Sequence, residues 1–279
     1  MRWLLTGAGG MLGTDLQEEL AVRGEPFIAL SRSELDVTDS RLVEAAVHEH
    51  LPDVIVNCAA YTKVDLAEEH EHAANAINGS AVELLAAAAN EVGALLVQVS
   101  TDFVFDGRND RPYEVTDAPH PLSAYGRSKF LGEVAATHAK RHLIVRTSWL
   151  FGTHGPNFVE AIRAQIRKET NPLRVVSDQR GRPTYTPHLA RAIVRLAQQG
   201  AEGVVHYADA DECSWFDFAC AIAAGSDRKV IPVTSDEFPR PAPRPAYSVL
   251  STERYERLTG VAPDSWREGL ADYLAKRPS

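Results

Sequence analysis

The chain has 279 residues, of which 44% are hydrophobic and 24% are charged, and these proportions are typical of a globular protein with a large core. The formal net charge of −9 argues against nucleic acid as a partner, because surfaces that bind nucleic acid are basic. Three cysteines without a CxxC pair argue against a disulfide framework or a zinc site, so we expect reduced thiols and a cytoplasmic protein. We expect no membrane span, because no apolar run is long enough, and no signal peptide, because a strand begins just after Met1.

A glycine-rich turn lies between the first expected strand, residues 3–5, and the first expected helix, residues 14–22. Its glycines Gly7, Gly10 and Gly13 are spaced three residues apart. Glycine permits unusual dihedrals and lets a pyrophosphate approach the backbone, and the free N–H groups of the helix that follows attract an anion. This order of elements predicts nucleotide binding, and the alternative is a turn without a ligand.

The second expected strand, residues 27–30, ends where this type of fold usually meets the ribose of adenosine. The segment that follows is Ser31, Arg32 and Ser33, with no carboxylate to bind a free 2′-hydroxyl. Arg32 and the two hydroxyls suit a 2′-phosphate, so the sequence favours NADPH, with NADH as the alternative cofactor. The competing interpretation is an arginine in solvent.

Tyr125 and Lys129 are the candidate catalytic pair. They are four residues apart at the start of an expected helix, so the phenol and the ammonium share one face, about one turn apart. A neighbouring ammonium lowers the pKa of a phenol, which makes Tyr125 a candidate proton donor near neutral pH. Thr101 follows the strand expected over 94–99, and open α/β sheets bind ligands at such strand ends. The competing interpretation is a packed tyrosine beside a solvated lysine.

Further candidates are less specific. Residues 73–90 predict one long alanine-rich helix, in which Asn78 is either a structural polar residue or part of a proton relay. Trp149 follows another strand end and belongs either to the core or to the wall of a sugar pocket. Arg240 and Arg244 lie in a proline-rich segment and are either partners of a substrate phosphate or arginines in solvent.

The alternation of strands and helices predicts an α/β fold, a Rossmann-type doubly wound parallel sheet with a smaller C-terminal substrate-binding domain. We expect the NAD(P)-binding Rossmann domain over residues 1–149. The segment at about 187–209 is expected to return to this domain. Residues 150–186 and 210–279 are expected to form the substrate-binding domain.

The glycine-rich turn, the Thr101 strand end and the Tyr125–Lys129 pair together resemble an extended short-chain dehydrogenase/reductase. A finer resemblance, to the dTDP-4-dehydrorhamnose reductase family, extends from residue 2 to about residue 250. It is carried by residues 60–65, 100–107, 146–152, 178–184 and 244–248. This family reduces the 4-keto group of dTDP-4-dehydro-6-deoxy-L-mannose with NAD(P)H and yields dTDP-L-rhamnose.

By position, the resemblance implies that Tyr125 donates the proton, that Lys129 binds the nicotinamide ribose and that Thr101 bonds near the reacting oxygen. Thr101, Asp102, Tyr125 and Trp149 are the implied sugar-site residues. The full set of expected cofactor residues is Gly7, Gly10, Met11, Leu12, Arg32, Asp36, Val37, Ala59, Ala60, Tyr61 and Lys129.

Some members of the family dimerise through Mg²⁺ held by glutamates, but Asp15 occupies the corresponding position here. This difference puts the metal-bridged dimer in doubt, so we expect no metal site and a monomer or weak homodimer. The resemblance implies a dTDP-sugar as the ligand. The alternatives are another nucleotide-sugar 4-ketoreductase, a dehydratase, an epimerase, or a non-catalytic NADP-binding regulatory subunit. Phe103 replaces the second acid of the dehydratases, and a regulatory subunit has no need of Thr101, Tyr125 and Lys129 together.

Overall fold

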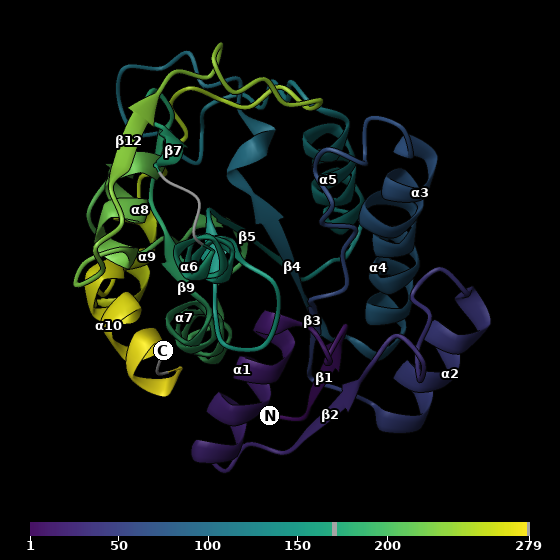
Figure 1. The fold of residues 1–279 in the computed structure, drawn as a ribbon. Helices are drawn as coiled ribbons and strands as arrows, with labels where there is room; N and C mark the ends of the chain where they lie inside the picture. Colours follow the sequence, from purple (N-terminus) through teal and green to yellow (C-terminus); the bar gives the residue numbers. More distant parts are fainter. Residues whose placement is uncertain (169–171, 278–279) are drawn as a thin grey trace.

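The computed structural model describes residues 1–168 and 172–277, and its centre is a six-stranded sheet in the order β10-β5-β4-β3-β1-β2 (Figure 1). Every pairing in this sheet is parallel. The strands are β1 (Trp3–Thr6), β2 (Phe27–Leu30), β3 (Val54–Asn57), β4 (Leu95–Thr101), β5 (His142–Thr147) and β10 (Gly203–His206). The predicted doubly wound parallel sheet is confirmed.

Helices cover both faces of the sheet (Figure 1). One face carries α1 (Met11–Val22), α7 (Thr186–Gln198) and α9 (Glu253–Thr259); the other carries α2 (Ser40–His50), α4 (Ala81–Val92) and α5 (Ala124–Ala136). In α1, Leu12, Leu16 and Leu20 recur every fourth residue and form the buried stripe of an amphipathic helix. Each fully buried leucine contributes roughly 1.5–3 kcal/mol to stability.

The sheet reverses its direction of growth between β1 and β3. The chain passes from β1 to β2 on one side and then crosses to the other side of β1 to form β3. Ligands of open α/β sheets bind at such a switch point, beyond the carboxyl ends of the strands. The glycine-rich turn follows β1 at this point, so the fold places it where a nucleotide would bind.

A buried chain of polar side chains joins the three central strands below this edge. Thr6 Oγ1 donates to Asn57 Oδ1 (2.7 Å), Asn57 Nδ2 donates to Gln98 Oε1 (2.8 Å), and Gln98 Nε2 donates to the Val99 carbonyl (3.1 Å). Because each buried group is satisfied, the network stabilises the strand ends in one register.

The C-terminal part of the chain forms a second core beside the sheet, built around Phe151, Phe218, Trp266 and Tyr273. Its strands pair as β6 (Leu150–Phe151) with β9 (Thr184–Tyr185), β7 (Leu173–Val176) with β12 (Val230–Val233), and β8 (Arg180–Gly181) with β11 (Cys213–Ser214). Its helices are α6 (Phe158–Arg167), α8 (Trp215–Ile222) and α10 (Trp266–Lys276). Residues 169–171 and 278–279, in the expected substrate-binding domain, lie outside the described residues.

The long helix expected over residues 73–90 is present, but it is not α-helical throughout. The structure has α3 (Glu71–Asn75), a π-helical turn (Ala76–Ser80) and then α4. Asn78 explains the interruption, because its side chain bonds both the backbone of Tyr61 and the hydroxyl of Ser128. A π-turn widens the helix locally and is common at functional sites.

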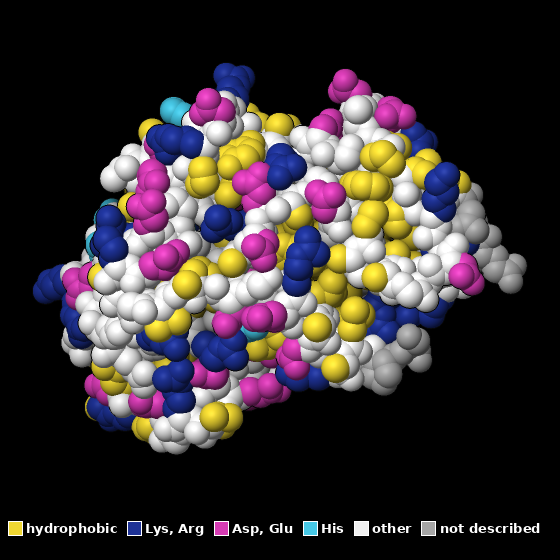
Figure 2. Space-filling model, turned by 90° about the vertical axis from the view of Figure 1, so that its left-hand side faces the viewer, with side chains coloured by type: hydrophobic (Ala, Val, Ile, Leu, Met, Phe, Trp, Pro, Cys, Tyr) yellow, Lys and Arg dark blue, Asp and Glu magenta, His cyan; other side chains and the backbone are white. Residues whose placement is uncertain are grey.

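Figure 2 shows the face of the molecule over β12, α8 and α10. Basic and acidic side chains are interspersed on this face, with apolar side chains between them. Such mixing gives no large field of one sign on that face. Within residues 1–168 and 172–277, no helix has the length and apolar character that crossing a membrane requires.

Candidate active site

The glycine-rich turn lies directly against the exit of β3. Gly7 has φ +61°, and a Cβ at this position would lie 2.5 Å from the backbone nitrogen of Ala59. The N–H of Gly10 donates to the Gly7 carbonyl at 3.0 Å and closes the turn just before α1 begins at Met11. Only glycine fits Gly7, because both the dihedral and the space exclude a side chain.

The same glycines and the residues after β2 line one hollow. Its walls are Gly7, Gly9, Gly10, Ser31, Arg32 and Ser33. Ser31 donates both its N–H (2.8 Å) and its hydroxyl (2.6 Å) to Glu34 Oε2, which fixes the loop, and Arg32 remains exposed at the rim. Helix N-termini and guanidinium groups bind phosphates, so a pyrophosphate at the glycines and a ribose phosphate beside Arg32 stay the prediction for this hollow.

The side chains of three other expected cofactor residues contact other parts of the protein. Leu12 and Val37 are buried in the cores on opposite faces of the sheet. The carboxylate of Asp36 accepts the N–H (3.0 Å) and hydroxyl (2.7 Å) of Thr38, and these bonds lower its pKa. Contacts of these residues with a cofactor therefore stay predictions, and for Leu12 and Val37 only the backbone is available.

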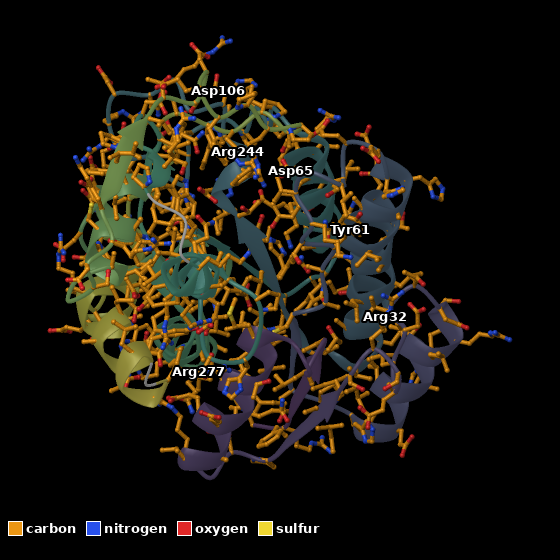
Figure 3. The ribbon with its side chains drawn as sticks, viewed as in Figure 1. Arg32, Tyr61, Asp65, Asp106, Arg244 and Arg277 are labelled. Atoms are coloured by element: carbon orange, nitrogen blue, oxygen red, sulfur yellow. The ribbon has the colours of Figure 1, made fainter. Side chains whose placement is uncertain are left out.

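Met11, Ala59, Ala60 and Tyr61 border the same edge of the sheet. Met11 opens α1 and faces the loop after β6, where a Cβ on Gly152 would lie 3.0 Å from Met11 Cγ. The half-buried Ala59, Ala60 and Tyr61 follow β3. Figure 3 shows Tyr61 on the edge that leads down to Arg32.

Lys129 is buried on α5, and its ammonium points to the end of β4. Nζ donates to the Val99 carbonyl at 2.6 Å, the same carbonyl that accepts from Gln98. Burial lowers the pKa of Lys129 to about 8, although the Glu133 carboxylate one turn along α5 acts to raise it. The ammonium is thus anchored where α5 meets the strand end.

Tyr125 lies one turn before Lys129 and packs edge-on against Phe103, with ring centroids 5.6 Å apart and an interplanar angle of 79°. Burial raises the pKa of Tyr125 to about 12, while a hydrogen bond with Thr101 lowers it and the Asp102 charge raises it further. The predicted lowering by Lys129 is therefore wrong, because desolvation of the phenolate dominates and the ammonium is bound to the Val99 carbonyl.

Thr101 and Asp102 adjoin Tyr125 at the end of β4. The Thr101 hydroxyl donates to Asp102 Oδ1 at 3.1 Å. Burial raises the pKa of Asp102 to about 6, with Ser248 and Thr101 acting in the opposite direction. Asp102 Oδ2 is buried and has no hydrogen-bond partner among the described residues, and its contact with a sugar stays a prediction.

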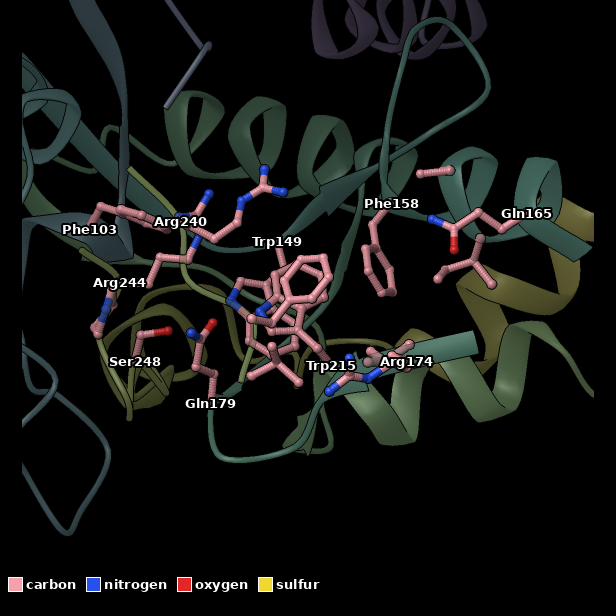
Figure 4. A pocket seen from close by; sticks show the side chains of 16 residues that line it. Phe103, Trp149, Phe158, Gln165, Arg174, Gln179, Trp215, Arg240, Arg244 and Ser248 are labelled. Carbon is pink, nitrogen blue, oxygen red and sulfur yellow. The ribbon is translucent and has the colours of Figure 1, made fainter. Parts of the chain in front are cut away.

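Trp149 lines a pocket of about 360 Å³ that opens from this point into the C-terminal part (Figure 4). Its ring stacks on Trp215 with centroids 3.6 Å apart and an interplanar angle of 7°. On Gly181 a Cβ would lie 2.5 Å from Trp149 Cε2, and the backbone of Trp149 has φ +48°. The indole is therefore fixed by its neighbours as a wall of the pocket.

The pocket also contains residues to which the sequence analysis gave no role. These are Phe158, Arg174, Gln179, Trp215 and Ser248, and Arg240 and Arg244 join them at the rim. Gln179 and Ser248 belong to segments that carried the family resemblance, which was the available signal. Phe158 and Trp215 open helices far apart in the chain, and no local pattern marks such residues as pocket walls.

Asp15, Glu18 and His154 lie together where α1 meets the loop after β6. Their potential ligand atoms lie within 4.8 Å of one another, and His154 Nε2 is 3.3 Å from Glu18 Oε1. Burial raises the pKa of Asp15, with Thr186 and His154 acting in the opposite direction. An imidazole with carboxylates is a donor set that divalent metals accept, so the expected absence of a metal stays a prediction.

A glycine-lined hollow at the switch point, with a Tyr–Lys pair on the helix that packs against β4, defines an NAD(P)-dependent oxidoreductase of the short-chain dehydrogenase/reductase class. The chain belongs to the family described as RmlD substrate binding domain, whose model matches residues 1–278. The family resemblance read from the sequence is confirmed.

Two curated relatives and one solved structure show the range of similar proteins. The dTDP-4-dehydrorhamnose reductase of Mycolicibacterium smegmatis is 42% identical over 282 residues, covering 98% of this chain and 85% of the relative. The dTDP-4-keto-6-deoxy-D-glucose reductase of Streptomyces niveus is 42% identical over 268 residues, covering 94% of this chain and 92% of the relative. The structure of dTDP-4-dehydrorhamnose reductase from Bacillus anthracis in complex with NADP has a TM-score of 0.94 and 38% identity, covering 99% of each chain.

Proposed function

We propose that this protein reduces the 4-keto group of dTDP-4-dehydro-6-deoxy-L-mannose with NADPH and yields dTDP-L-rhamnose, the last step of dTDP-rhamnose synthesis. The observation that carries the proposal is the contact of Tyr125 with Phe103, which is a wall of the pocket that contains Trp149. The hollow of Gly7 and Arg32 lies at the carboxyl ends of β1 and β2 in the same parallel sheet. The named relatives, which are reductases of dTDP-4-keto sugars, support this substrate class.

When bound, NADPH supplies the hydride that the chain itself lacks. Tyr125 delivers its phenolic proton to the oxygen of the sugar as negative charge develops there. A pKa of about 12 keeps that proton on Tyr125 at neutral pH, and an alkoxide is a stronger base than a phenolate, so the transfer runs downhill. Lys129 keeps its positive charge one turn along α5, anchored on the Val99 carbonyl, and the Thr101 hydroxyl adjoins the phenol of Tyr125.

The direct test follows NADPH absorbance with purified protein and enzymatically made dTDP-4-dehydrorhamnose. Oxidation of NADPH that depends on the sugar nucleotide, with dTDP-rhamnose as the product, supports the proposal. Tight binding of NADPH without turnover would reject this substrate and leave another 4-keto sugar nucleotide, or a regulatory role, as the function.

The value of kcat/KM is expected to fall about tenfold per pH unit above pH 8, because the buried ammonium of Lys129 has a pKa of about 8 and acts only when protonated. The value of kcat/KM decreases with pH because deprotonation of Lys129 also removes its positive charge. In a Lys129→Arg variant the residual activity should lose this alkaline fall, because a guanidinium does not deprotonate in this range. An unchanged alkaline fall in the variant would assign it to another group.

Replacing Arg32 by alanine is expected to weaken NADPH binding about tenfold or more and to leave NADH binding nearly unchanged. Only NADPH carries the 2′-phosphate, and a charge-assisted hydrogen bond is worth about 1.5–3 kcal/mol. Dissociation constants for both cofactors, measured by fluorescence, check the difference. Arg41→Ala is the control, since Arg41 pairs with Asp39 at the start of α2; equal losses for both cofactors in Arg32→Ala would contradict the assignment.

A second candidate is the reduction of a different dTDP-4-keto sugar, since the Streptomyces niveus relative has that name at the same identity. Assays with both keto sugars and product analysis by NMR separate the two.

We further propose that residues 1–149, with the segment at about 187–209, bind NADPH and that residues 150–186 and 210–279 bind the sugar nucleotide. The proposal places a monomer or weak homodimer in the cytoplasm.

A further inference from the structure

The turn after β3, residues 64–69, contacts a segment more than 170 residues later in the chain. Asp65 in this turn lies beside Arg240 and Arg244, which are 175 and 179 residues away in sequence. Figure 3 labels Asp65 next to Arg244 in the upper half of the molecule, below Asp106. The contact joins the sheet half of the protein to the proline-rich segment over the pocket.

The carboxylate of Asp65 accepts three donors from that segment. Arg240 Nη2 lies 2.6 Å from Oδ2, Arg244 Nη2 lies 3.0 Å from Oδ1, and the Ala242 N–H lies 3.3 Å from Oδ1. Arg244 Nη1 in turn donates to the Ala242 carbonyl at 2.9 Å. Burial acts to raise the pKa of Asp65, but these partners, led by Arg244, outweigh it and lower the pKa.

Both guanidinium groups also line the pocket that contains Trp149 (Figure 4). The Arg240 side chain is 47% exposed and donates to Asp65 only through Nη2 among the contacts of the described residues, so its other nitrogens remain available. One carboxylate against two guanidinium groups leaves a net positive charge at the rim. Arginine in fixed orientation is the residue best suited to bind a diphosphate through paired hydrogen bonds.

The same turn also holds the start of the catalytic helix. Glu68 Oε1 accepts the N–H of Ala124 at 2.8 Å, immediately before Tyr125. Asp65 and Glu68 are three residues apart, so one short turn contacts both the pocket arginines and the helix that carries the proton donor.

We propose that Asp65 is a positioning residue that holds Arg240 and Arg244 in the orientation that binds the diphosphate of the sugar nucleotide. The inference rests on the proposed substrate class. Its physical rival is competition, in which the carboxylate occupies the arginines and must be displaced by the phosphates. Positioning predicts weaker binding when the charge of Asp65 is removed, and competition predicts tighter binding.

The test compares Asp65→Asn with the wild type in two measurements: the dissociation constant of dTDP and the steady-state constants for the keto sugar. Asparagine keeps the size of the side chain and removes its charge. We expect the dTDP dissociation constant and KM to rise about tenfold or more, the scale of one charge-assisted hydrogen bond. The value of kcat at saturation and the affinity for NADPH should stay within about twofold, since Tyr125 and Lys129 are untouched.

Asp264→Asn is the matched control, because Asp264 also pairs with an arginine, Arg191, at 2.8 Å. An unchanged or lower dTDP dissociation constant in Asp65→Asn overturns the inference, and so does a wild-type protein that does not bind dTDP. If dTDP binding weakens in the variant but the wild type does not turn over the keto sugar, the inference stands and the proposed reaction falls. A melting temperature equal to that of the control excludes misfolding as the cause.

Discussion

Replacing Tyr125 by phenylalanine is expected to lower kcat about 10²–10⁴-fold, the usual contribution of a positioned general acid. The variant loses one hydroxyl and keeps the ring, so the edge-on contact with Phe103 is retained and the fold should not change. The affinity for NADPH should also be retained, because Tyr125 is not among the residues that line the hollow of the glycine turn and Arg32. Single-turnover measurement of NADPH oxidation, with a separate binding titration, checks both statements.

The control for this variant is Tyr247→Phe, which removes a hydroxyl that donates to Glu212 Oε2 at 3.2 Å and makes no contact with Tyr125 or Lys129 among the described bonds. Its kcat should stay near that of the wild type. A Tyr125→Phe variant with more than about a tenth of the wild-type kcat would exclude Tyr125 as the proton donor. Water or Asp102, whose pKa lies at about 6, would then be the source of the proton.

The order of the elements was predictable because each has a local cause. The apolar strand before Gly7, the leucine stripe of α1 and the hydrophobic strand before Thr101 are patterns within a few residues. The π-helical turn at Asn78 was not predictable, because it depends on hydrogen bonds to Tyr61 and Ser128 at sequence separations of 17 and 50. The alanine-rich composition favours a helix before and after Asn78, but it does not indicate that the Asn78 side chain forms these hydrogen bonds.

The features of the candidate site were also predictable only where their cause is local in sequence. Spacing alone placed Tyr125 and Lys129 on one face of α5, and the structure has them there. The direction of the Tyr125 pKa depended on burial, which is a property of the whole fold and which outweighs a neighbouring charge. The stack of Trp149 on Trp215 and the contact of Asp65 with Arg244 join segments distant in sequence, so no periodicity reveals them.

Replacing Gly7 by alanine is expected to destabilise the protein by about 2–5 kcal/mol and to weaken NADPH binding strongly. About 1–2 kcal/mol comes from the left-handed backbone at φ +61°, and about 1–3 kcal/mol comes from overpacking. The new Cβ would lie 2.5 Å from the Ala59 nitrogen and 2.8 Å from the Cys58 carbonyl carbon, both backbone atoms that cannot rotate away. Relief requires β1 and β3 to separate where the pyrophosphate is expected, so stability and affinity should fall together.

Gly24→Ala separates the two causes. Gly24 has nearly the same dihedral, φ +66°, but nothing lies within 4 Å of the position of its Cβ. The control variant should therefore lose only the backbone contribution, about 1–2 kcal/mol, and bind NADPH as the wild type does. Chemical denaturation and cofactor titration of both variants measure the difference. If the two variants lost equal stability, the close approach of β1 and β3 at Gly7 would be relieved at no cost, and the turn could not be the rigid seat of the pyrophosphate that the proposed reaction requires.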